Sequence, residues 1–168
     1  MDEPGKLPAV TTGITLVLVS VYLAFYTKKL TTIPCGNDFL SILSSQFVHV
    51  SLLHLASNVF SLWYLANLER SMGVAKFTTL VAGLAIASSA ADALIGNRHC
   101  SIGFSGVLFG LFAWSILTMR GFKWYNLGLV GVMLMANTGP NISLRGHAIG
   151  AVTGVVFALI YQMTNRKT

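Results

Sequence analysis

The chain has 168 residues, a length typical of one soluble domain, but only 10% of its residues are charged and 54% are hydrophobic. A soluble domain carries roughly 25% charged residues, so the composition excludes an ordinary soluble domain. The net charge of +6 comes from basic residues scattered over expected loops and termini. They form no basic and aromatic stripe of the kind that binds nucleic acid, so no nucleic-acid partner is expected.

Six long uncharged runs predict one all-α domain over 1–168, a polytopic membrane helix bundle with six transmembrane helices, since a membrane-spanning helix needs about 20 mostly apolar residues. In chain order the helices are expected at 9–27, 50–68, 77–94, 105–119, 124–137 and 147–163. Lys28-Lys29 is expected to close the first helix and Glu69-Arg70 the second, with a long loop between them. The first segment is interpreted as a retained helix, because acidic residues precede it and no signal-peptide cleavage pattern follows it.

The distribution of Lys and Arg predicts the orientation, because cytosolic loops carry an excess of these residues. With six spans the two termini share a side. That side holds Lys6, Arg70, Lys76, Arg120, Lys123, Arg166 and Lys167, and the other holds Lys28, Lys29, Arg98 and Arg145. The excess predicts that both termini lie in the cytosol. The helices expected at 50–68, 105–119 and 147–163 then begin at the non-cytosolic face.

Polar residues fall near the starts of those same three helices. His54 and Asn58 are four residues apart, so they share one helical face. Ser105 opens the fourth helix and His147 the sixth. Because polar groups inside a membrane usually face the bundle interior, we expect the four side chains to converge at one depth near the non-cytosolic face.

Small residues on the fourth and sixth helices explain how Ser105 and His147 could meet. Membrane helices approach closely where such residues line the contact. The two stripes are Gly106, Gly110 and Ala113, and Gly150, Gly154 and Ala158. A serine hydroxyl needs a base within about 2.6–3.2 Å, and histidine has a suitable pKa for that role. With no acidic residue expected nearby, the pattern indicates a Ser–His pair, with the Ser105 amide, His54 and Asn58 as candidate oxyanion donors.

These residues resemble the rhomboid family of intramembrane serine proteases, in its minimal six-helix form. The matching pieces are Gly103-x-Ser105-Gly106, His147 with Gly150 and Gly154, His49-x4-His54-x3-Asn58, and Glu69-Arg70-x-x-Gly73. The resemblance implies that Ser105 is the nucleophile and His147 the general base. It also implies an oxyanion hole of His54, Asn58 and the Ser105 amide, with His49 a structural residue near the cavity. The implied partners are the lipid bilayer and single-span membrane proteins, which serve as substrates, and no cofactor is implied.

The chain departs from the family pattern at two places. Many members carry a Trp-Arg pair in the first loop, where this chain has Leu40-Ser41, which leaves the anchoring of the loop open. Many also carry a Tyr one turn after the serine, stacked on the histidine. Here that residue is Phe109, which can stack but has no hydroxyl group. Neither change removes a catalytic group.

Two other functions are compatible with six membrane helices. A catalytically inactive rhomboid-like protein could bind and escort membrane proteins, although such relatives typically lack the Ser or the His. A small channel or transporter would be expected to carry a polar path through the bilayer, and often inverted repeats, neither of which the sequence shows.

The two cysteines, Cys35 and Cys100, are too few for a metal centre. Both fall on expected non-cytosolic loops, either as a disulfide or as two free thiols.

Overall fold

The computed structural model describes residues 7–95, 101–119 and 144–165. Their helices are α1 (Ala9–Tyr26), α2 (Phe39–Ser45), α3 (Leu52–Tyr64), α4 (Ala66–Met72), α5 (Val74–Ile95), α6 (Ser105–Thr118) and α8 (Leu144–Asn165). Within these ranges there is no strand. The fold is all-α, as the composition predicted, and the helix expected at 124–137 lies outside the described residues.

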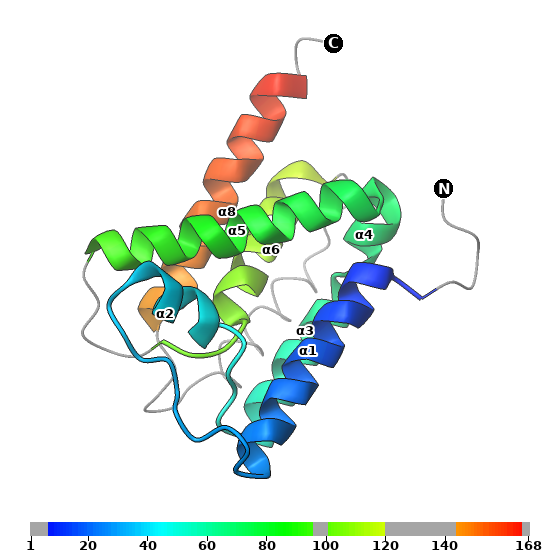
Figure 1. Cartoon of the computed structure of the whole chain (residues 1–168). Helices are drawn as coiled ribbons and strands as arrows, with labels where there is room; N and C mark the ends of the chain where they lie inside the picture. Colours follow the sequence, from blue (N-terminus) through cyan, green and yellow to red (C-terminus); the bar gives the residue numbers. More distant parts are fainter. Residues whose placement is uncertain (1–6, 96–100, 120–143, 166–168) are drawn as a thin grey trace.

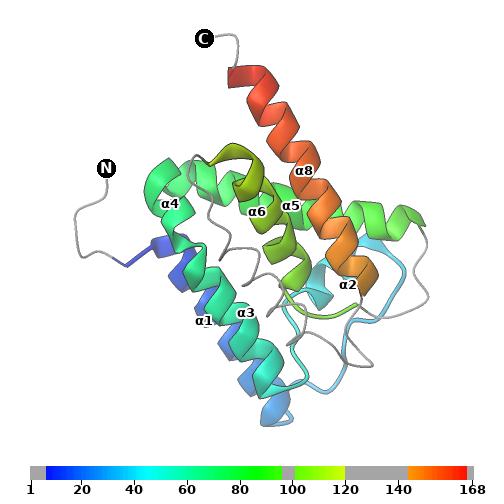
Figure 2. The same cartoon turned by 180° about the vertical axis from the view of Figure 1, so that it is seen from behind.

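The helices form two groups that α5 connects. Figures 1 and 2 show α1 and α3 side by side in one group and α6 beside α8 in the other. Helix α5 crosses the second group, in front of it in Figure 1 and behind it in Figure 2. Short α4 joins α3 to the start of α5, and α2 packs against α5 near the first residues of α8. The most extensive helix–helix contact in the described structure is that between α6 and α8.

Helix length and burial indicate how the bundle sits in a bilayer. Among the described helices, α1, α5 and α8 are long and apolar enough to cross a membrane. Exposed apolar side chains cover α1 and α8, among them Leu16, Leu23 and Ile160. In α6, by contrast, nine of the 14 residues are buried. At 1.5 Å per residue this helix is about 21 Å long, shorter than a hydrocarbon core of roughly 30 Å. It is therefore too short to cross that core by itself.

The helix expected at 50–68 is two helices in the structure. The first ends at Tyr64, and α4 continues to Met72, beyond the Glu69-Arg70 pair that was expected to close it. The turn at Leu65 redirects α4 toward the start of α1. There the Glu69 carboxylate accepts hydrogen bonds from Val10 N at 2.8 Å and Thr11 N at 2.9 Å. The prediction of a single helix was wrong because this tie joins Glu69 to Val10 and Thr11, which lie 59 and 58 positions earlier in the chain. A pattern of neighbouring residues does not reveal such a contact.

Three further boundaries differ from expectation. Helix α5 begins at Val74 instead of 77, directly after Gly73, whose φ of +84° favours glycine. Helix α8 begins at Leu144, so His147 lies within its first turn instead of opening it. The loop after α1 contains the unexpected helix α2, which Asp38 caps by accepting a hydrogen bond from Ser41 N at 2.9 Å. By contrast, α1 and α6 end within one residue of the expected positions.

Candidate active site

Glycines bring α6 and α8 into direct backbone contact. A Cβ atom at Gly110 would lie 3.0 Å from Gly150 O, and one at Gly106 would lie 3.3 Å from Gly146 O. On the facing helix, a Cβ at Gly150 would collide with Gly106 O, and one at Gly154 would collide with Gly110 O. The two glycine stripes therefore pack against each other, as their spacing predicted.

This packing places Ser105 beside His147. Ser105 Oγ is 2.7 Å from His147 Nε2, and both side chains are buried, with exposed fractions of 3% and 5%. The ring centroid of Phe109, one turn after Ser105, is 4.5 Å from that of His147 at an interplanar angle of 30°. Phe109 therefore stacks on the imidazole, as expected. The distance between hydroxyl and imidazole is the one that proton transfer requires.

His54 contacts the short segment that leads into Ser105. The φ of Gly103 is +99°, and a Cβ atom at this position would collide with the imidazole of His54. Gly103 thus lets the chain pass directly over that ring. Within the described residues, neither ring nitrogen of His54 has a hydrogen-bond partner. Both nitrogens therefore remain available to a group bound near Ser105.

Asn58 and His49 support His54 from two sides. Asn58 Nδ2 donates to His54 O at 2.7 Å, which commits one of its two N–H groups to the backbone of α3. The buried ring of His49 lies 4.8 Å from that of His54, centroid to centroid. This contact fits the structural role expected of His49. For Asn58, the bond to the backbone makes it a support of the helix turn that carries His54.

Helix α2 anchors the segment before Ser105. Ser45 Oγ donates to Ser101 O at 2.7 Å, and Gly103 N donates to Ser45 O at 3.1 Å. Gln46 Nε2 donates to Ser89 Oγ of α5 at 2.6 Å. These bonds hold the first loop in place although the sequence has Leu40-Ser41 where a Trp-Arg pair would anchor it. The sequence pattern did not predict this anchor, although Asp38 before a short apolar run is a signal for the start of a helix.

The first loop also carries a covalent tie. Cys35 is disulfide-bonded, which decides the alternative that the sequence left open at this residue. The chain has one other cysteine, Cys100, which lies outside the described residues.

A small cavity, lined by both polar and apolar residues, opens beside Ser105 and His147. It encloses about 40 Å³, whereas one water molecule needs roughly 10–15 Å³ of such volume. Its polar lining includes Gln46, Ser88 and Asp92. The cavity can therefore hold water next to the hydroxyl of Ser105.

One acidic residue, Asp92, lies near this site, where the sequence predicted none. It lines the same cavity as Ser105 and His147, and its carboxylate pairs with Arg145 at 3.0 Å. Nδ1 of His147 has no hydrogen-bond partner among the described residues. The described structure therefore contains no Ser–His–Asp chain. In the same part of the chain, no three His, Cys, Asp or Glu side chains are placed to hold a metal ion.

Comparison with known proteins identifies relatives. A family model described as the rhomboid domain matches residues 36–164, more than half of the chain. A protein of Acanthamoeba polyphaga mimivirus, named as a rhomboid protein, is 26% identical over 89% of this chain and 91% of its own. An uncharacterised protein of Mycobacterium leprae is 28% identical over 93% of this chain and 74% of its own. A mitochondrial rhomboid-like protein of Arabidopsis thaliana is 28% identical over 72% of this chain and 43% of its own.

Proposed function

The chain belongs to the rhomboid family, and from this premise we propose that it is an intramembrane serine protease. Ser105 is the nucleophile and His147 the general base. The observation that carries the proposal is the 2.7 Å distance between Ser105 Oγ and His147 Nε2, in a buried site between two closely packed helices. A relative that only bound membrane helices would need neither group, nor this geometry between them.

The reaction follows from the positions of these groups. His147 Nε2 takes the proton of Ser105 as Oγ attacks the scissile carbonyl carbon, and a tetrahedral intermediate forms. The protonated imidazole then gives its proton to the leaving amine, and the peptide bond breaks to leave an acyl group on Ser105. Water from the adjoining cavity, deprotonated by the same imidazole, attacks this ester and releases the second product.

The negative charge of the intermediate needs hydrogen-bond donors. The first N–H groups of a helix have no partner within that helix, and Ser105 is the first residue of α6. Its amide is one donor. His54 supplies a second, because its ring lies against Gly103 and neither of its nitrogens has a partner in the described structure. Asn58 acts with it, because its bond to His54 O holds the turn of α3 that carries the imidazole.

The substrate class follows from the surroundings of the site. Exposed apolar side chains on α1 and α8 face the bilayer, and Ser105 lies at the start of a helix too short to span it. A polypeptide reaches such a serine from within the membrane. We therefore assign single-span membrane proteins as substrates, cut where their helix unwinds readily.

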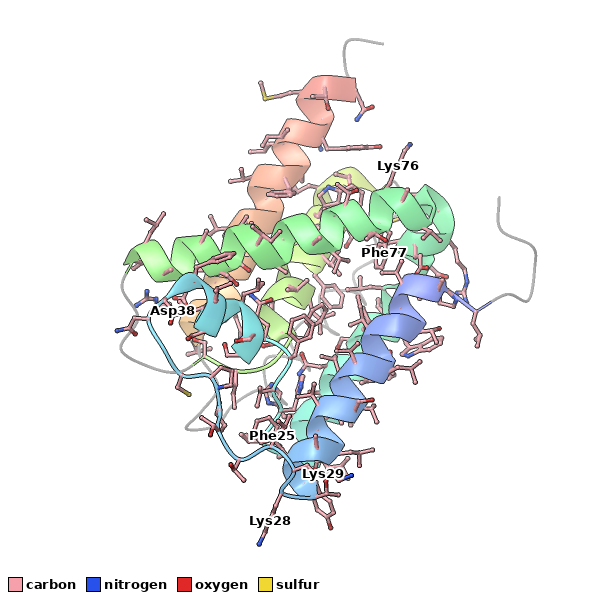
Figure 3. All side chains as sticks on the ribbon, in the orientation of Figure 1. Phe25, Lys28, Lys29, Asp38, Lys76 and Phe77 are labelled. Atoms are coloured by element: carbon pink, nitrogen blue, oxygen red, sulfur yellow. The ribbon has the colours of Figure 1, made fainter. Side chains whose placement is uncertain are left out.

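The proposal includes an orientation. Figure 3 places Lys28 and Lys29 at the end of α1 and Lys76 at the opposite end of the molecule, near the start of α5. With both termini in the cytosol, Lys76 is cytosolic and Ser105 opens toward the other side. The test uses sealed vesicles whose interior corresponds to the cytosol. A cysteine added at either terminus of a Cys35→Ser, Cys100→Ser variant should react with an impermeant maleimide only after these vesicles are opened. Labelling of the sealed vesicles would reverse the assignment.

Covalent labelling of Ser105 tests the function directly. The purified protein, reconstituted in liposomes, should react with a fluorophosphonate at Ser105 and cleave a fluorogenic transmembrane peptide. Ser105→Ala and His147→Ala should each abolish both reactions, because neither group works alone. More than a few percent of wild-type activity in either folded variant would contradict the assigned pair. Absence of both reactions in the wild-type protein would favour the binding-only relative.

A further inference from the structure

An ion pair joins the helix that carries His147 to α5. Arg145 Nε lies 3.0 Å from Asp92 Oδ1, and Arg145 Nη2 donates to the backbone carbonyl of Asp92 at 3.3 Å. Arg145 is the second residue of α8, two residues before His147, and Asp92 lies in the last turn of α5. The pair thus ties the first turn of α8 to the end of another helix.

The charges of this pair stand against the dipoles of their own helices. A cation near a helix N-terminus and an anion near a helix C-terminus are each unfavourable. Asp92 is also buried, with a side-chain exposed fraction of 6%. Burial of a carboxylate is costly unless a partner compensates. Arg145 compensates for this cost by pairing with the carboxylate of Asp92. It also donates to the backbone carbonyl of Asp92, one of the last four carbonyls of α5, which have no partner within the helix.

The glycine contacts alone restrain rotation and sliding of α8 only weakly. Gly150 and Gly154 fix how closely α8 approaches α6. Glycine surfaces, however, have no side chains that interlock, so they limit rotation and sliding of α8 weakly. His147 lies before both glycines, in the first turn, where the backbone contact of Gly146 with Gly106 is looser. A second anchor in that turn would fix the direction of the imidazole.

We propose that Asp92 and Arg145 are positioning residues for His147, and that their ion pair sets the imidazole at its distance from Ser105. The inference rests on the proposed protease function. Asp92 acts through Arg145 and not as a third catalytic group. Nδ1 of His147 has no partner among the described residues, whereas the carboxylate of Asp92 is engaged by Arg145.

Kinetics of length-matched variants test the proposal. Arg145→Met and Asp92→Asn should each lower kcat on a transmembrane peptide by about ten- to a hundredfold, the effect expected of a small misplacement. KM should stay within about twofold, because neither side chain is assigned to substrate binding. Arg145→Lys keeps a cation that reaches Asp92 and should retain most of the activity. Lys76→Met removes an exposed cation at the other end of α5 and should leave kcat unchanged.

The double variant separates one shared device from two independent roles. If Asp92 and Arg145 act only through each other, Asp92→Asn with Arg145→Met should lose no more activity than the worse single variant. Losses that multiply in the double variant, or wild-type kcat in Arg145→Met, would overturn the proposal.

A spectroscopic measurement tests the positioning without relying on activity. The imidazole signals of His147 in ¹³C-labelled protein, assigned by His147→Ala, should shift in Arg145→Met and return toward wild type in Arg145→Lys. Those of His49 should not move. Unchanged His147 signals in Arg145→Met would overturn the positioning role. If the signals shift but wild-type protein neither cleaves peptide nor labels at Ser105, the proposed function fails and the ion pair's effect on His147 stands.

Discussion

Phe109 is the residue that packs directly on the catalytic imidazole in the proposed mechanism. Its ring lies 4.5 Å from His147, centroid to centroid, from a position one turn along α6 from Ser105. No carboxylate is bonded to Nδ1 in the described structure, so this ring contact is the direct restraint on the rotation of the imidazole, beside the positioning role proposed for Arg145. An aromatic contact of this kind contributes about 0.5–1.5 kcal/mol beyond the area that it buries.

Removal of the Phe109 ring should therefore slow catalysis more than addition of a hydroxyl group. We expect Phe109→Ala to lower kcat by about tenfold or more, because a loosened imidazole spends less time aligned with Ser105. Phe109→Tyr keeps the ring and should stay within a few-fold of wild type. Rates of fluorophosphonate labelling, which need no transmembrane substrate, measure the effect. Equal rates for the two variants would show that the stack does not orient His147.

His54 and Asn58 should contribute to rate without being essential. The amide of Ser105 remains as a donor when either side chain is lost, and removal of one oxyanion donor typically costs about 10²–10³ in kcat. We expect His54→Ala to have the larger effect, since its ring contacts Gly103, and Asn58→Ala the smaller. Single-turnover cleavage of a transmembrane peptide measures both. If the double variant turned over like wild type, the two residues would be structural.

At the scale of the helices, the most extensive contact in the described structure is that between α6 and α8. A Cβ atom at Gly150 would collide with the backbone oxygen of Gly106, and backbone cannot move aside as a flexible side chain can. One methyl group should therefore separate the two helices. We expect Gly150→Ala to lower kcat about 10²-fold, the cost of roughly 1 Å of misplacement, and to slow labelling of Ser105 in parallel.

The same substitution in open space provides the control. A Cβ at Gly13 of α1 would meet nothing within 4 Å, so Gly13→Ala should leave kcat unchanged and raise helix stability slightly. Wild-type activity and unfolding temperature in Gly150→Ala would mean that α6 and α8 do not touch in the way described.

The same elements show how far the sequence predicts the structure. Glycines four residues apart on two helices predicted the contact of α6 with α8, because helical periodicity alone puts Gly150 and Gly154 on one face. Ser105 and His147 follow from that contact. Long apolar runs likewise predicted α1 and α6 nearly to the residue, since composition decides what spans a bilayer.

What the sequence did not predict depends on contacts between distant segments. The split between α3 and α4 places Glu69 at the start of α1, 58 residues from Thr11. The anchor of α2 uses Ser45 and a backbone oxygen 56 residues away. No acidic residue was expected near Ser105 and His147, yet Asp92 lines their cavity, because periodicity says nothing about where α5 crosses α8. Each of these three features is a polar tie across the bundle, which no local pattern encodes.

At the scale of the whole molecule, Glu69 ties α4 to the start of α1. Its buried carboxylate accepts bonds from Val10 N and from both N and Oγ1 of Thr11. The residue before α1 is Pro8, which offers no side-chain cap. Glu69 therefore caps α1 from another helix, with its negative charge at the favourable end of the helix dipole.

Loss of this cap should destabilise the bundle and spare the chemistry. Glu69→Ala leaves buried N–H donors without acceptors, each costing about 1–3 kcal/mol, so we expect the free energy of unfolding in bicelles to fall by about 3 kcal/mol or more. Glu69→Gln keeps one acceptor oxygen and should lose less.

Arg70→Ala, at an exposed neighbour on the same helix, provides the control and should change the free energy of unfolding by about 0.5 kcal/mol at most. The kcat per labelled Ser105 should stay at the wild-type value in all three, because α4 and the start of α1 lie away from the beginning of α8, the helix that carries His147 (Figures 1 and 2). A fall in kcat per labelled site with unchanged unfolding would instead place Glu69 in the catalytic machinery, and an unchanged free energy of unfolding in Glu69→Ala would show that the tie to α1 does not hold the bundle together.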